Sequence, residues 1–279
     1  MSLNISFDHV IHYINDAHEL KDEWLNKGFH AVEGGRHEHR GSYNTLLHFG
    51  IEYIEFLAID DFELFKRVGA QDVKDSPFYA IGDDQFEEGF YKVCIRTRNL
   101  DALAERFREK GLQVNGPVPL SRKRPDGTLL EWSLLFVGDE SSDLPLPFFI
   151  DWHETDEERI AGLKDANVIH SHEAGNTSIT GFTMAVHDAK QTADNWSTWF
   201  ELDVEEPAFD ETLNATVYTV NLPGAKLHFA EPKGNGLVQD TLTKRGERPF
   251  ELRLHNANNV SSFTTKGAHY TISGGNNHA

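Results

Sequence analysis

The fold is decided by two stretches that share one pattern, FDHVIHYINDAHELKDEWLNKG at residues 7–28 and FYKVCIRTRNLDALAERFREKG at residues 90–111. Each begins with a β-rich run that ends in a residue able to cap a helix, Asp16 in the first and Asn99 in the second. Apolar residues at helical spacing follow, and a glycine stands where the helix should stop. Each stretch therefore predicts a strand, a capped helix and a stop.

A third copy of the pattern begins with TGFTMAVHD at residues 180–188, followed by a helical stripe without a closing glycine. After each helix the hydrophobic period changes to that of strands, so each copy reads β-α-β-β-β. PFELRLHN (249–256) and AHYTISG (268–274) indicate a truncated fourth copy, with no helix between them. The chain is thus a repeat of one supersecondary unit.

One such unit has a sheet with a single face covered by its helix, so two units must pair to bury the other face. We therefore predict an α+β fold of repeated βαβββ modules paired into open, cup-shaped barrels. The first pair is expected over residues 1–155, with modules at about 5–60 and about 89–153. A linker is expected at 156–178, and the third module with the partial fourth at 179–279.

Charge and composition narrow the classes of function. Lys and Arg number 26 against 45 Asp and Glu, and 26 − 45 = −19, so we expect neither nucleic acid nor a membrane surface as a partner. The single Cys94 excludes an internal disulfide, and the start of the chain resembles no secretion signal, which fits a reducing cytoplasm. A basic cluster at 121–124 runs into Pro-Asp-Gly and is interpreted as a solvated turn.

Strand alternation selects the candidate metal ligands. Phe7, His9, Ile11 and Tyr13 should share one face of the first strand, where His9 is the strong ligand donor. Glu55 stands among apolar neighbours in the strand 51–59, and a carboxylate there needs a cation, a metal or a hydrogen-bond donor. His9 and Glu55 could therefore supply two of three protein ligands for a divalent metal.

Two alternatives stay open for this pair: His9 as a core histidine bonded to the backbone, and Glu55 in a salt bridge to Arg36 or Arg40. In the second module the position that matches His9 is Lys92, which is not a usual metal ligand. The last strand of that module does supply Asp151, which completes a candidate set of His9, Glu55 and Asp151.

The stretch GGRHEHRGSYN at residues 34–44 is the best candidate for a polar lid over the cup. Its arginines suit a carboxylate, so an anion-binding role for Arg36 and His37 ranks above metal binding by His37 and His39. The alternative is an ordinary polar loop that is rich in histidine. In the third module His228 falls at the place of Glu55, but Gly181 stands at the place of His9, which favours a structural role there.

Several of these motifs resemble the glyoxalase-like domain family of the vicinal-oxygen-chelate (glyoxalase/bleomycin-resistance/dioxygenase) superfamily. The resemblance covers roughly residues 5–155 well and the rest of the chain only through the module pattern. It is carried by Asp8-His9, Gly34 to His37, Asn44, Tyr53 to Leu57, and Pro147 to Trp152. It implies a glyoxalase-like cup with metal sites on the first and last strands of a module, which His9 and Glu55 match and Lys92 does not.

The resemblance implies a metal-dependent lyase, isomerase or dioxygenase-type enzyme that chelates adjacent oxygens of a small-molecule substrate. One divalent metal, Mn, Fe, Co, Ni or Zn, would be the cofactor. Glu55 and His37 are the catalytic candidates. The candidates for contact with substrate are Arg36, His37, Arg40, Asn44, Tyr53 and Trp152.

The missing ligand at Lys92 instead favours a metal-free protein that binds or sequesters a drug or metabolite in an aromatic cup. A structural or adaptor role would leave the cup filled by its own side chains. Homodimerisation is compatible with paired-module folds.

Overall fold

The computed structural model describes residues 3–69, 71–123, 127 and 129–274. The helices are α1 (Ala17–Asn26), α2 (Phe62–Gly69), α3 (Pro77–Asp83), α4 (Leu100–Glu109), α5 (Asp156–Asp165), α6 (Ala189–Phe200) and α7 (Leu237–Arg245). The strands of the first half are β1 (Ile5–Tyr13), β2 (Val32–His37), β3 (Ser42–His48), β4 (Tyr53–Ile59), β5 (Gly89–Thr97), β6 (Gln113–Lys123), β7 (Leu129–Gly138) and β8 (Phe148–Asp151). The strands of the second half are β9 (Thr177–Ala185), β10 (Ala208–Asp210), β11 (Ala215–Leu222), β12 (Ala225–Pro232), β13 (Arg248–Asn256), β14 (Ser261–Thr265) and β15 (Ala268–Ser273).

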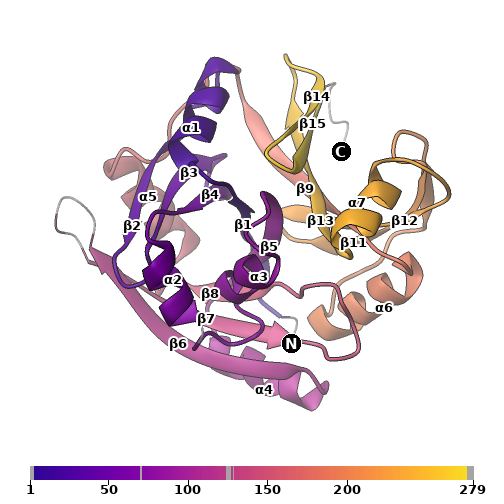
Figure 1. Cartoon of the computed structure of the whole chain (residues 1–279), viewed down its shortest axis with the longest axis horizontal. Helices are drawn as coiled ribbons and strands as arrows, with labels where there is room; N and C mark the ends of the chain where they lie inside the picture. Colours follow the sequence, from indigo (N-terminus) through magenta and orange to yellow (C-terminus); the bar gives the residue numbers. More distant parts are fainter. Residues whose placement is uncertain (1–2, 70, 124–126, 128, 275–279) are drawn as a thin grey trace.

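The strands form two curled, mixed sheets (Figure 1). The first sheet has the order β2-β3-β4-β1-β5-β8-β7-β6, and the second has the order β10-β11-β12-β9-β13-β15-β14. In each sheet the first strands of two modules pair antiparallel, and each of them pairs parallel with the last strand of its own module. The prediction of an α+β fold built from paired modules is confirmed.

The predicted caps begin the module helices. The side chains of Asp16, Asn99 and Asp188 each accept a hydrogen bond from a backbone N–H in the first turn of α1, α4 and α6. At the end of α6, where no glycine stands, Glu201 adopts the left-handed conformation with φ 55°. A non-glycine residue therefore ends α6.

The helix-covered sides of the two sheets share one hydrophobic core. Phe7 of β1 packs on Phe182 of β9 with ring centroids 4.7 Å apart, and Trp24 of α1 packs on Tyr270 of β15 at 4.9 Å. The predicted placement of Phe7 beside His9 is therefore wrong. A register shift between these two residues in the pairing of β1 with β5 turns Phe7 to the other face of the sheet.

The opposite face of the first sheet, here called the first cup, carries His9, Ile11 and Leu57. Helices α2 and α3, which come between the two modules in sequence, lie over this face (Figure 1). Phe65 and Ile81 of these helices are buried against the strands. The first cup is therefore lined by strands and covered by its own helical insertion.

The segment predicted as a linker contains α5, whose Arg159 and Leu163 are buried. A capping box formed by Thr155 and Glu158 begins this helix. Because α5 packs against the first half, its side chains can contribute to the first cup. In the described part of the chain, no helix is long and apolar enough to cross a membrane.

Candidate functional site

The first cup brings His9 and Glu55 together from β1 and β4, with His9 Nε2 3.6 Å from Glu55 Oε2. His9 is 3% exposed. Its Nδ1 lies 2.7 Å from Asp8 Oδ1. Burial raises the pKa of Asp8, but the hydrogen bond and charge of His9 and the charges of Arg159 and Arg96 outweigh it, so the net shift is downward.

Asp8 is therefore ionised and can only accept a hydrogen bond, so the proton lies on His9 Nδ1. With the Nδ1 proton alone, His9 presents a lone pair at Nε2 to the acceptor oxygen of Glu55. Two acceptors that face each other at 3.6 Å in a buried site require a cation between or beside them, either a proton or a metal.

Asn44 fixes the other side of Glu55. Its Nδ2 donates to Glu55 Oε1 at 2.6 Å, while its Oδ1 is buried with no partner among the described residues. A Cβ at Gly34 would clash with Asn44 Oδ1, so the absence of a side chain on Gly34 lets Asn44 take this position. Gly34 of the predicted lid thus leaves room for Asn44 to hold the carboxylate of Glu55.

Aromatic rings hold the imidazole in place. Tyr53 stacks between His9 and His48, with ring centroids 4.5 Å apart on each side, and Phe148 meets His9 edge-on at 5.5 Å. Burial lowers the pKa of His48 to about 3, and its Nε2 has no partner among the described residues. The site is therefore buried and largely apolar apart from its few polar groups.

Asp8 is held in turn by Trp152, whose Nε1 donates to Asp8 Oδ2 at 3.0 Å. The Arg159 guanidinium of α5 lies over the Trp152 ring, 3.4 Å from its centroid. Trp152, Asp8 and His9 form a hydrogen-bonded chain that ends at the Nε2 facing Glu55. Such carboxylate–histidine pairs orient metal-binding imidazoles in proteins.

Cys94 of β5 is the third buried donor near His9: donor atoms of Asp8, His9 and Cys94 lie within 4.8 Å of one another. Burial raises the pKa of the Cys94 thiol well above its ordinary value. A buried thiol with a raised pKa is a poor nucleophile. A metal ion would favour the thiolate, so Cys94 is a candidate ligand only in the metal-bound protein.

The structure does not bring Asp151 to this pair. Phe148 and Ile150 of β8 face the first cup, so alternation places Asp151 on the opposite side, where its Oδ1 accepts from His153 N. Lys92 also points elsewhere, donating from Nζ to the main-chain oxygen of Asp75 at 2.5 Å. Asp151 and Lys92, the two positions of the second module considered from the sequence, therefore provide no ligand at this site.

The polar stretch at 34–44 divides between two faces. Arg36 pairs with Asp60 and Glu38 on the surface and lines a shallow hollow with His18 and Tyr43, outside the first cup. The predicted salt bridge from Glu55 to Arg36 does not form.

His37 faces inward and its Nδ1 contacts Ser42 Oγ at 3.1 Å. Burial lowers the pKa of His37, although the charge of Glu55 acts in the other direction. Arg40 pairs with Asp72 and lies over Phe78, which fastens the insertion that carries α3. His37 is thus the inner member of the stretch, and Arg40 positions the cover of the first cup.

The donor set suits a divalent cation of the first transition row. An imidazole and a carboxylate face each other, the imidazole tautomer is fixed by Asp8, and a potential thiolate lies beside them. His9 and Glu55 would hold the ion.

Comparison with known proteins agrees with the geometry. The sequence matches the family model described as "Glyoxalase-like domain" over residues 7–200. The chain therefore belongs to the glyoxalase-like domain family. Membership of this family places the chain in the vicinal-oxygen-chelate superfamily. It confirms the resemblance inferred from Asp8-His9 and the other motifs.

Solved structures show the same fold. A hypothetical protein from Staphylococcus aureus is 22% identical, with a TM-score of 0.79, and the match covers 97% of this chain and 99% of that one. A triple mutant of 4-hydroxymandelate synthase from Streptomyces coelicolor is 12% identical, with a TM-score of 0.55, and the match covers 90% of this chain and 71% of that one. Comparison with curated proteins gave no match.

Sequence reasoning assigned no role in the site to Asp8, Arg159 or Arg122. Strict alternation puts Asp8 behind His9, whereas the register shift in β1 lets their side chains meet. Arg159 was hidden in the predicted linker, and Arg122 in a predicted turn, although its guanidinium reaches Gly35 across the cup. The sequence signal for α5 was its capping box, Thr155 with Glu158 three residues later, which predicts the helix but not what Arg159 contacts.

Proposed function

We propose that this glyoxalase-like protein is a metal-dependent enzyme of the lyase, isomerase or dioxygenase type that acts on a small molecule with adjacent oxygen atoms. The observation that carries the proposal is the 3.6 Å approach of His9 Nε2 to Glu55 Oε2, with Asp8 holding the other imidazole nitrogen. This arrangement is a two-ligand cation site with a supporting carboxylate.

A bound divalent metal would supply a Lewis acid that polarises the substrate oxygens. The residues of the chain would supply the rest. Asp8 and Asn44 orient the imidazole and the carboxylate, and the stacked Tyr53 and His48 keep water away from them. His37, whose pKa is lowered by burial, would be unprotonated near neutral pH, as a proton acceptor has to be.

The helical insertion has a role in this proposal. Phe65 and Phe78 pack together over the first cup, and Arg40 ties the insertion to the predicted lid through Asp72. A substrate that reaches His9 has to displace these rings or enter beside them. We infer that α2 and α3 exclude water from the bound substrate.

A metal-free binding protein is the second candidate, favoured by one observation. Asp151 and Lys92, at the two ligand positions of the second module, both point away from the first cup. In that case Glu55 would meet a cationic group of the ligand, and the aromatic rings would bind its apolar part.

Elemental analysis of protein purified without a metal-affinity tag separates the two candidates. The enzyme proposal expects near-stoichiometric metal in the wild type, after incubation with Mn, Fe, Co, Ni and Zn in turn, and its loss in both His9→Ala and Glu55→Ala. A wild type that retains none of the five metals would remove the chelate mechanism and leave ligand binding alone.

A further inference from the structure

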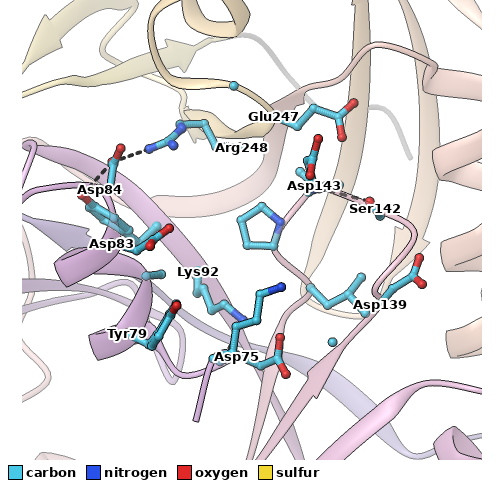
Figure 2. Close-up of a pocket in the computed structure, with 18 of the residues that line it drawn as sticks. Asp75, Tyr79, Asp83, Asp84, Lys92, Asp139, Ser142, Asp143, Glu247 and Arg248 are labelled. Atoms are coloured by element: carbon cyan, nitrogen blue, oxygen red, sulfur yellow. Dashed lines mark hydrogen bonds and ion pairs between the residues drawn. The ribbon is translucent and has the colours of Figure 1, made fainter. Parts of the chain in front are cut away.

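A second pocket lies between the two halves of the chain, away from the first cup, and has a volume of about 390 Å³ (Figure 2). Its walls come from α3, β5, the segment after β7 and the turn between α7 and β13. The volume is within the range of small-molecule sites in proteins. Any ligand bound here would contact both halves.

Lys92 forms the floor of this pocket and is 3% exposed. Its ammonium has one acceptor among the described residues, the main-chain oxygen of Asp75, and no carboxylate of that part of the chain lies within 4.0 Å of it. An ammonium carries three donors, and a buried charge without a counter-ion is costly. The charge of the Asp75 carboxylate acts on Lys92 from beyond ion-pair distance, so the floor of the pocket carries an ammonium with no carboxylate in contact.

Two other cations of the pocket share one carboxylate. Arg245 and Arg248 both pair with Asp84, and the Tyr91 hydroxyl donates to the same carboxylate at 2.8 Å. Figure 2 shows Arg248 and Asp84 along one wall, apart from Lys92. Lys92, by contrast, has no carboxylate within ion-pair distance among the described residues, so its ammonium can contact one supplied by a ligand.

The rim of the pocket has the opposite charge. Asp83, Glu140 and Asp143 are exposed and line the pocket, and none of them has a cation within ion-pair distance in the described part of the chain. With a net charge of −19 on the whole chain, a free anion would be repelled before it reached the floor. A ligand for Lys92 therefore has to carry a positive charge as well.

We propose that this pocket binds a small zwitterion with a carboxylate and an ammonium, such as an amino acid, with the carboxylate on Lys92 and the ammonium at the rim near Asp83 and Asp143. The apolar side chains of Phe90, Leu144 and Leu146 line the space between the two ends. Burial lowers the pKa of Lys92 to about 8, so a bound carboxylate would relieve a real cost.

The test is isothermal titration of the full chain with glycine, γ-aminobutyrate and ε-aminocaproate, which carry the same two charges at increasing separation. Butyrate and butylamine serve as single-charge probes. We expect one chain length to bind best and both single-charge probes to bind at least about tenfold more weakly, since a hydrogen bond to a charged group contributes about 1.5–3 kcal/mol. Equal binding of butyrate or butylamine, or no binding of any zwitterion at millimolar concentration, overturns the proposal.

Two variants locate the binding. Lys92→Met keeps the length of the side chain and removes its charge, and Asp143→Asn changes an exposed rim residue that folding does not depend on. Both should weaken the best zwitterion, by about tenfold or more for Lys92→Met. Lys74→Met, at an exposed lysine of the same pocket, should not. If Lys92→Met does not fold, unchanged binding in Asp143→Asn alone contradicts the proposal.

Discussion

The two halves of the chain carry the same modules but treat corresponding positions differently. In the first half the parallel pair β1 and β4 sets Ile11 opposite Glu55, and in the second half β9 and β12 set Thr183 opposite His228. His9 of β1 then corresponds to Gly181. A Cβ on Gly181 would lie 2.8 Å from His228 Nε2, so the imidazole fills the space that His9 fills in the first half.

The polar groups of the second half satisfy one another. Glu251 is buried and accepts from Thr183, from Thr271 at 2.7 Å and from Arg253 at 2.9 Å. In the first cup, by contrast, His9 and Glu55 face each other without a shared donor. The comparison teaches that a repeat can keep its polar residues for stability in one copy and leave them available for a ligand in another.

A matched pair of histidine variants is the strongest test of this difference between the two halves. His9→Ala should weaken divalent-metal binding by more than about 100-fold, because it removes a ligand, which costs more than the loss of a supporting group. His228→Ala should leave metal binding unchanged. Calorimetric metal titration of both variants measures the difference, and equal losses would show that the two halves do not differ as described.

The supporting carboxylate gives the next largest effect. Asp8→Asn keeps the shape of the side chain but can present an N–H to His9 Nδ1, which favours the wrong tautomer. We expect metal affinity to fall about 10–100-fold, with Trp152→Phe giving a smaller loss through the hydrogen bond to Asp8. Metal affinity that is unchanged in Asp8→Asn would contradict the role given to Asp8.

In the second half the corresponding loss should be one of stability. Burial raises the pKa of Glu251, but the charge of Arg253 and the hydrogen bonds from Thr183 and Thr271 outweigh it, so its pKa is lowered. Glu251→Gln should therefore lower the free energy of unfolding by about 2–3 kcal/mol near neutral pH, without affecting metal binding.

The pH dependence of that loss follows from the sign of the shift. A lowered pKa contributes stability that is fully present above the ordinary value of 4.5 and is lost as the pH falls through the folded-state pKa. Urea unfolding of the wild type and Glu251→Gln should therefore differ most at neutral pH and converge in acid. A difference that grows on acidification would be the wrong sign for this account.

The smallest effect is expected at Arg36. Asp60→Asn removes one of its two surface partners, and an exposed ion pair is screened by solvent, so both stability and metal affinity should change little. Thermal unfolding and the same metal titration check this. A large loss of metal affinity would show that Arg36 contributes to the site in the first cup, contrary to its position on the surface.

The fold could be predicted well because local sequence signals mark each copy of the repeat. Caps such as Asp16 and Asn99 and the change of hydrophobic period mark each module without reference to the others. The pairing of modules then follows from the need to cover each sheet. What local signals could not predict was the register shift beside His9, which moved Phe7 to the other face.

The candidate site was predicted less completely. His9 and Glu55 were found because each is a strong donor on an apolar strand face, and the structure places them 3.6 Å apart. Asp151 was selected by its place in the module, but the strand ends with that side chain on the outer face. Arg159 could not be found, because its contact with Trp152 depends on how α5 packs.

The most direct test of the central claim is X-ray absorption at the metal edge of the wild-type protein loaded with zinc or cobalt. The account predicts scattering from one imidazole together with oxygen donors about 2.0–2.2 Å from the metal, and loss of the imidazole scattering in His9→Ala. A bound metal without imidazole scattering, or a wild type that cannot be loaded, would contradict the assignment of the first cup as a metal site.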